Sequence, residues 1–169
     1  DNPMAHQKWT AKQLWKQTNG EIDVLCAGLG TTGTITGTAK QLKNKNSSMQ
    51  VVGVMREDSN YVPGVRTKGL LELIGFDWEK QVDYIEKIGT VESYRKSMQL
   101  SRNGIVVGPS SGFALCGLLK FLEKRIQKKN KHPHFLHKKK KKKKKRNYKK
   151  KQNLNKQKKH ISRITKRYR

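Results

Sequence analysis

Apolar residues gather in short runs between polar and glycine-rich segments along the first 125 residues of the chain. Runs this short fit buried strands better than helices. We predict three strands, at Ile22–Ala27, Val51–Met55 and Ile105–Val107. Longer stretches with helical spacing of apolar positions, bounded by capping or glycine signals, predict helices. These are Thr10–Thr18, which Asn19-Gly20 closes, followed by Thr36–Lys45, Val91–Arg102 and Phe113–Arg125.

The first two strands enclose a glycine loop and a helix. Strand, loop, helix and strand together occupy about the 30 residues of a βαβ crossover, which makes its two strands parallel. We therefore predict an α/β fold with an open, mostly parallel sheet and flanking helices. Ligand sites of such sheets lie at the carboxyl ends of the strands. Two predicted strand ends, at Gly28 and Gly108, each lead through glycine and hydroxyl residues into a helix.

Charge divides the chain into two parts. The formal net charge is +27, but residues 1–125 hold 17 Lys and Arg against all 12 Asp and Glu, a balance of +5. Residues 126–169 hold the other 22 basic residues and no acidic one. We predict a globular segment over 1–125 and a polybasic, low-complexity, disordered tail over 126–169.

The tail contains eight consecutive lysines, Lys138–Lys145. One interpretation is a weak, sequence-blind binder of nucleic acid through its phosphates. The other is a product of frameshift in adenine-rich lysine codons, which would not be evolved protein. Both stay open from the sequence.

The first glycine loop, Gly28–Gly37, places Thr31, Thr32 and Thr34 among four glycines. A glycine loop that opens a helix gathers unpaired backbone N–H groups at the positive end of the helix dipole, where a phosphate binds well. Glycines let the backbone come close and adopt positive φ, and threonine hydroxyls add donors. The plainer alternative is a tight strand-to-helix turn with hydroxyl caps.

A dinucleotide site is a second alternative, because residues 28–33 also match G-x-G-x-x-G. Glu57 and Asp58 follow about 24 residues later, near where a ribose-binding acid is expected. The second loop, Gly108-Pro-Ser-Ser-Gly112, argues against this reading, since a dinucleotide fold has no particular use for it.

Five segments resemble, in order and at similar spacing, motifs of the cysteine synthases and cystathionine β-synthases. They are Asn2–His6, Gly20–Asp23, Ala27–Gly37, Val52–Val54 and Gly104–Gly112. The resemblance covers about residues 2–125. Each motif is moderately specific, and the ordered set is strongly so.

The resemblance implies the C-terminal half of a fold-type-II, tryptophan-synthase-β-like enzyme, hence an incomplete domain with pyridoxal 5'-phosphate as cofactor. It implies that Ser110 bonds the pyridine nitrogen, while Ser111 caps the following helix. The residues implied to surround the phosphate are Gly30, Thr31, Thr32, Gly33 and Thr34. One departure is Thr32, which stands where the family usually has glycine and either bonds the phosphate or crowds it.

The implied activity is β-replacement on O-acetylserine or serine by sulfide or another thiol, in cysteine biosynthesis, by an enzyme that is a homodimer when complete. A neutral Ser110 hydroxyl does not hold the pyridine nitrogen protonated, which favours loss of a β-substituent over a long-lived carbanion. His6 is interpreted as a structural partner in its loop rather than a general base.

The Schiff-base lysine of the family lies in a Ser-x-Lys-type segment well before the phosphate loop, and nothing ahead of Gly28 resembles it. Lys8, Lys12 and Lys16 have the spacing of a solvated helix face. We therefore expect no catalytic residue and no activity in this chain alone. The two cysteines show no metal-site spacing, and no apolar run approaches the length of a membrane span, so we expect a cytoplasmic protein with no metal and no membrane partner.

Overall fold

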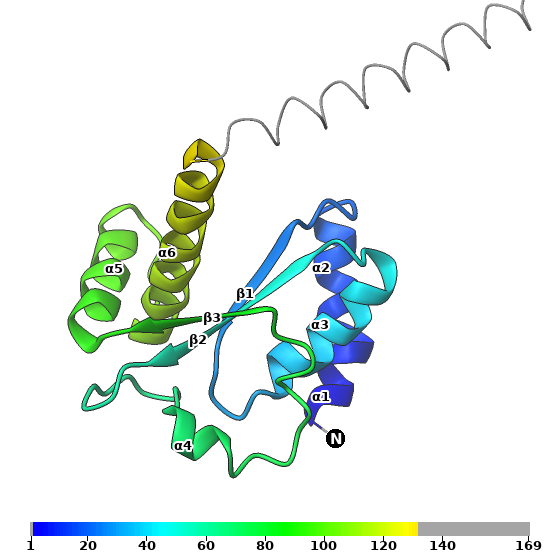
Figure 1. The fold of residues 1–169 in the computed structure, drawn as a ribbon, viewed down its shortest axis with the longest axis horizontal. Coiled ribbons are helices and arrows are strands. Elements are labelled where there is room, and N and C mark those ends of the chain that lie inside the picture. The colour runs from blue at the N-terminus through cyan, green and yellow to red at the C-terminus, as the bar shows by residue number, and fades with distance from the viewer. Residues whose placement is uncertain (1, 132–169) are drawn as a thin grey trace, which may run out of the picture. The chain divides into compact units, whose positions relative to one another are not determined.

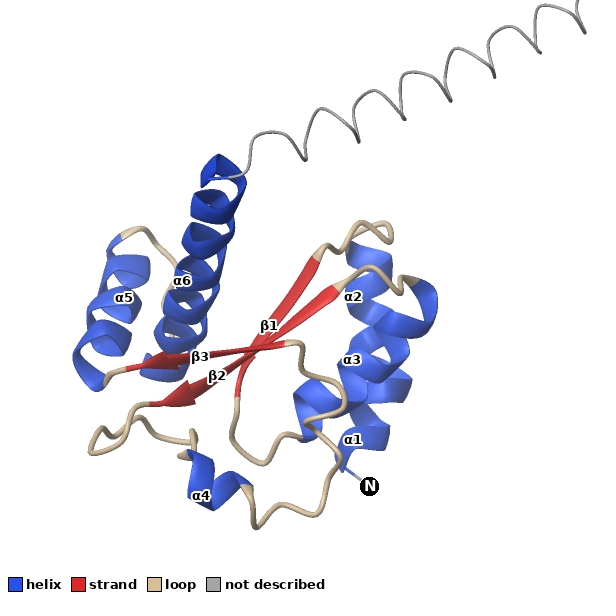
Figure 2. Cartoon of the chain, viewed as in Figure 1, coloured by secondary structure: helices blue, strands red, loops and turns tan. Residues whose placement is uncertain are grey.

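Three parallel strands form the sheet at the centre of the fold. The computed structural model describes residues 2–131, and its strands are β1 (Val24–Gly28), β2 (Gln50–Arg56) and β3 (Tyr84–Ile88), in the order β1-β2-β3 (Figure 1). Val24 is paired with Gln50, and Val52 with Tyr84. Helices flank the sheet (Figure 2), so the predicted α/β class with an open parallel sheet is confirmed.

Helices pack on both faces of the central strand β2. Side chains alternate between the two faces along a strand, so both faces need apolar residues, and this accounts for the continuous apolar sequence of β2. Val51 and Met55 join one buried cluster, with Leu42 and other residues of α3 (Gly33–Lys45). Val54 joins the opposite cluster, with Phe113 of α6 (Pro109–Lys131).

The predicted helices are present, and most of them begin earlier than expected. Helical structure runs from Asn2 as α1 (Asn2–Ala5), the π-helical segment η1 (His6–Thr10) and α2 (Ala11–Gln17). The predicted C-terminal glycine cap is confirmed, since Gly20 N donates to Trp15 O at 2.9 Å with a φ of 76°. The remaining helices are α4 (Lys68–Leu71) and α5 (Thr90–Arg102).

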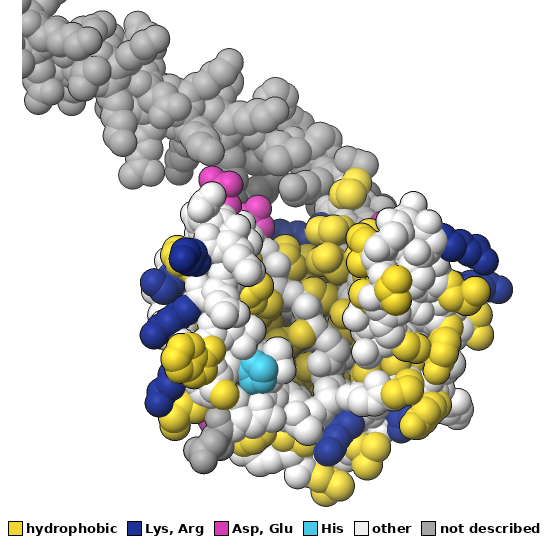
Figure 3. All heavy atoms as spheres, turned by 180° about the vertical axis from the view of Figure 1, so that it is seen from behind, with side chains coloured by type: hydrophobic (Ala, Val, Ile, Leu, Met, Phe, Trp, Pro, Cys, Tyr) yellow, Lys and Arg dark blue, Asp and Glu magenta, His cyan; other side chains and the backbone are white. Residues whose placement is uncertain are grey.

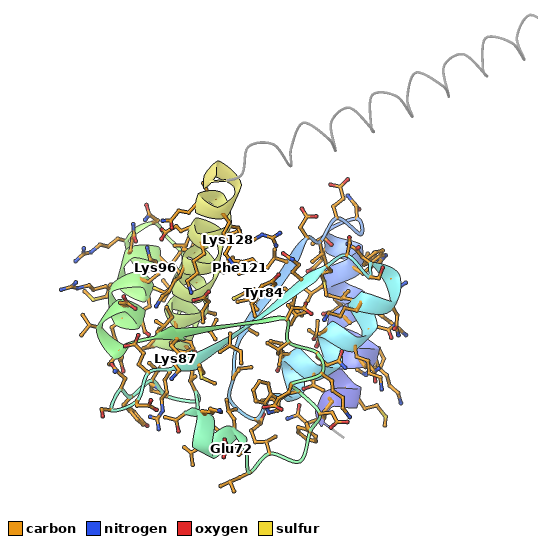
Figure 4. All side chains as sticks on the ribbon, in the orientation of Figure 1. Glu72, Tyr84, Lys87, Lys96, Phe121 and Lys128 are labelled. Carbon is orange, nitrogen blue, oxygen red and sulfur yellow. The ribbon has the colours of Figure 1, made fainter. Side chains whose placement is uncertain are left out.

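The predicted third strand, Ile105–Val107, is absent. Residues 105–107 form no strand, and Ile105 and Val106 are 56% and 87% exposed, because no described strand pairs with this segment. The third strand is instead β3, which was not predicted because most of its residues are exposed and it has no apolar run. Only Glu86 and Ile88 of β3 are buried, and the Tyr84 ring packs against that of Phe121 in α6, tilted by 51° with centroids 4.9 Å apart (Figure 4).

The sheet and the helices packed on it form a compact unit that ends at Glu123. The predicted division at residues 125 and 126 stays a prediction, and the lysine run Lys138–Lys145 lies outside the described residues. Within residues 2–131, no helix combines the length and the apolar character needed to cross a bilayer.

Candidate functional site

The loop after β1 is fixed at its first residue. Leu29 is fully buried, its N–H donates to Val54 O at 2.7 Å, and its carbonyl accepts from Arg66 N at 2.8 Å. The next residue, Gly30, lies directly against the carbonyl oxygen of Gly64, and a Cβ there would collide with it. Gly30 is therefore a position of close backbone approach to another part of the protein, and its predicted contact with a phosphate stays a prediction.

Thr32 carries the unusual backbone of the loop. Its φ of 63° and ψ of −4° are left-handed, a conformation that costs a non-glycine residue about 1–2 kcal/mol. The side chain is 3% exposed, and its Oγ1 has no hydrogen-bond partner among the described residues. Its hydroxyl also makes no capping bond to α3. A glycine at this position would adopt the same backbone conformation without that cost.

Two glycines of the loop serve helix packing instead. The side chain of Asn2 occupies the space that a Cβ on Gly33 would take, and the carbonyl of Pro3 does the same at Gly37. Their spacing of four residues places both glycines on one face of α3, where α1 approaches closely. The expectation that glycines supply positive φ was wrong for this stretch, because in residues 28–37 that conformation falls on Thr32.

The hydroxyls of Thr31 and Thr34 lie on exposed residues at the start of α3. Asn2 Nδ2 donates to Thr31 Oγ1 at 3.4 Å, and Thr34 Oγ1 lies 3.1 Å from Nε2 of His6. Without a capping side chain, the N–H groups of the first turn have no intrahelical acceptor. This end of α3 therefore offers several donors to an anion.

The second loop is placed by the packing of α6 on β1. Phe113 Cδ1 lies 3.5 Å from the Cβ position of Gly28, and Cys26 Sγ donates to the carbonyl of Ala114 at 3.4 Å. Ser110 is exposed in the first turn of this helix, three residues before Phe113. Both hydroxyl-bearing turns therefore adjoin the same end of β1.

Ser111 does not cap α6, contrary to expectation. The helix begins at Pro109, so Ser111 already lies within its first turn. The carbonyl of Gly108 accepts from Ser111 N at 3.0 Å and from Gly112 N at 3.4 Å. Gly108 therefore stands at the N-cap position, and its carbonyl accepts the first bonds of the helix.

The carboxylates considered for a ribose are turned toward β3. Asp58 pairs with Lys87 Nζ at 3.7 Å, and Glu57 Oε2 lies 3.4 Å from the Cβ position of Gly89, directly after β3. A ribose-binding acid would have to face the loop after β1, on the other side of β2. Their orientation argues against a dinucleotide site.

The two cysteines are free thiols held in the neutral form. Burial, followed by the nearby charge of Glu86, raises the pKa of Cys26 to about 12. Burial is also the main cause that raises the pKa of Cys116, where Lys96 opposes it and Glu92 adds to it. Since the thiolate is the reactive form, neither thiol is a nucleophile near neutral pH.

One face of the molecule is hollowed at its centre (Figure 3). Apolar and uncharged groups line the hollow, while Lys and Arg side chains lie at its margins. A surface of this kind suits a ligand with an apolar body and a few polar attachment points.

A match to a family model assigns the chain to a class of enzymes. Residues 1–132 match the family model described as pyridoxal-phosphate dependent enzyme, and the chain belongs to this family, whose cofactor is pyridoxal 5'-phosphate.

The chain is similar to cysteine synthases and to a cystathionine beta-synthase. The chain is 34% identical over 121 residues to cysteine synthase B of Salmonella typhimurium, covering 71% of this chain and 40% of that protein. It is 35% identical to cystathionine beta-synthase of Apis mellifera over 131 residues, covering 70% and 26%. The solved cysteine synthase of Entamoeba histolytica superposes with a TM-score of 0.61 at 29% identity, covering 68% of this chain and 36% of that one. The chain therefore spans about 40% of the length of the bacterial relative.

Proposed function

We propose that this chain is the part of a cysteine synthase-like enzyme that holds the phosphate and the pyridine nitrogen of pyridoxal phosphate. The main support is the position of two turns at the same end of β1. One is the uncapped start of α3, where Thr31 and Thr34 are exposed, and the other is the first turn of α6, where Ser110 is exposed. Two polar anchors beside one strand end suit a small ligand with a polar group at each end.

The residues at the first turn fit a phosphate. Thr31 and Thr34 would donate through their hydroxyls, and Gly30, Thr32 and Gly33 through backbone N–H groups. The hydroxyl of Thr32 is enclosed by protein, so this residue contributes by its backbone only. We assign the phosphate to this turn because its hydroxyls belong to exposed residues and its first N–H groups have no capping side chain.

Ser110 would hold the other end of the cofactor. When bound, pyridoxal phosphate acts as an electron sink for bonds at the amino-acid Cα, and the partner of its ring nitrogen tunes that strength. A neutral hydroxyl partner favours loss of a β-substituent. This supports β-replacement on O-acetylserine or serine by sulfide or another thiol as the activity of the complete enzyme, in cysteine biosynthesis.

We propose that the chain by itself does not complete that reaction. Lys8, Lys12 and Lys16 are exposed along the helical N-terminal segment, as expected for a solvated face, and residues 1–27 contain no Ser-x-Lys-type segment. A homodimer for the complete enzyme and a cytoplasmic location are part of the same proposal. The two free thiols support a reducing compartment.

Thermal protection tests the cofactor assignment. Pyridoxamine 5'-phosphate is the suitable probe, because its amine does not condense with the many lysines as an aldehyde would. We expect it to raise the melting temperature of the full chain in about 0.15 M salt, which screens the charges of the basic residues in 126–169. NAD should give no protection.

The matched control is Thr34→Val, which keeps the tail and removes one proposed phosphate donor. Its protection by the same probe should be clearly smaller. Equal protection of both proteins would assign the binding to the basic tail and refute the site.

A further inference from the structure

His6 joins two helical segments through its imidazole ring. Nε2 lies 3.1 Å from Thr34 Oγ1 on α3, and Nδ1 lies 2.9 Å from Thr10 Oγ1, four residues along the chain. Both ring nitrogens therefore have a hydroxyl partner, and the three side chains form a continuous series that ends at the start of α3. The ring is only partly buried, so this contact lies at the edge of the site.

The local backbone explains how His6 reaches both partners. Residues His6–Thr10 are π-helical, and Ala11 N donates to the carbonyl of His6, a bond across five residues. Single-turn π segments are rare and occur often at functional sites. The close packing of α1 on Gly33 and Gly37 then holds this turn against α3.

The direction of the hydrogen bonds decides what Thr34 offers a ligand. A neutral imidazole has one N–H and one acceptor nitrogen, and a hydroxyl has one proton to give. If Thr34 gives its proton to Nε2, only oxygen lone pairs face an incoming anion. If Nε2–H donates to Thr34 Oγ1, the threonine proton is available for that anion.

We propose that His6 is a positioning residue that keeps Thr34 a hydrogen-bond donor to the cofactor phosphate. The Thr10 hydroxyl donates to Nδ1, Nε2–H donates to Thr34 Oγ1, and the Thr34 hydroxyl donates outward. Hydrogen bonds arranged head to tail polarise one another, which strengthens the last donor toward a negative charge. The inference rests on the proposed function, because it assumes that the phosphate binds at this turn.

Binding of pyridoxamine 5'-phosphate to single and double variants of the full chain tests this role. We expect His6→Leu to weaken binding roughly tenfold, since a charge-assisted hydrogen bond is lost or misdirected. His6→Gln, which keeps an amide N–H near the place of Nε2, should recover most of the affinity. In a Thr34→Val background, His6→Leu should cost no further affinity.

The outcomes separate this inference from the proposed function. Equal losses from His6→Leu with and without Thr34 would show that His6 only stabilises the fold, and would overturn the inference. Wild-type binding that is insensitive to Thr34→Val would overturn the proposed site and the inference together. Loss on Thr34→Val with no effect of His6→Leu would overturn the inference alone.

A measurement on the unmodified chain guards against variants that fail to fold. The imidazole nitrogen resonances of His6, assigned from their absence in His6→Gln, report which nitrogen carries the proton. We expect a protonated Nε2 in the presence of pyridoxamine 5'-phosphate. An acceptor Nε2 under that condition would contradict the proposed direction.

Discussion

Replacing Thr32 with glycine is expected to stabilise the chain by about 1 kcal/mol, although most changes at buried positions destabilise. The gain comes from relief of the left-handed backbone, about 1–2 kcal/mol, and from removal of a buried hydroxyl that lacks a partner. The loss of a buried methyl group and the greater chain entropy of glycine offset part of it. Urea unfolding followed by circular dichroism measures the difference.

A matched substitution isolates the backbone contribution. Thr38 is also buried with an unpartnered hydroxyl, but it lies inside α3 without positive φ. Thr38→Gly should therefore destabilise by about 1 kcal/mol or more. If both variants lose stability, the backbone of Thr32 is not strained.

Replacing Gly37 with alanine should destabilise the chain by about 1–3 kcal/mol. The added methyl group would meet the backbone carbonyl of Pro3 and would lie 3.0 Å from the Cβ of His6. Since a backbone group cannot rotate away as a side chain can, α1 must shift from α3. The same shift would stretch the contact between His6 and Thr34, so affinity for pyridoxamine 5'-phosphate should fall as well.

Gly69→Ala is the control for this change. Gly69 lies in α4 with no atom within 4 Å of its Cβ position, so alanine there should be neutral or slightly stabilising. A Gly37→Ala protein as stable as Gly69→Ala would show that the two helices do not pack as closely as described.

Apolar patterning predicted the parts of the fold that are buried on both sides. The run in β2 and the strand-loop-helix order after Ile22 are sufficient for a parallel βαβ unit. The edge strand β3 escaped prediction because only Glu86 and Ile88 are buried in it, and a strand with so few buried apolar residues resembles a loop. Residues 105–107 have high β propensity but form no strand, because β propensity has no effect without a partner strand.

The two loops of the site were predictable, but the roles of their residues were only partly so. Glycine content indicated a close backbone approach, which holds at Gly30. Glycine content could not distinguish a contact with a helix, as at Gly33 and Gly37, from a contact with a phosphate, since both require a residue without a Cβ atom. The contact between His6 and Thr34 spans 28 residues and depends on a π-helical turn that no sequence pattern announced.

Amide resonances of the full chain, titrated with pyridoxamine 5'-phosphate, test most directly whether one cofactor bridges both turns. We expect the signals of Thr31–Thr34 and of Ser110 to shift together and to fit a single dissociation constant. Shifts confined to one of the two turns, or two different dissociation constants, would contradict it.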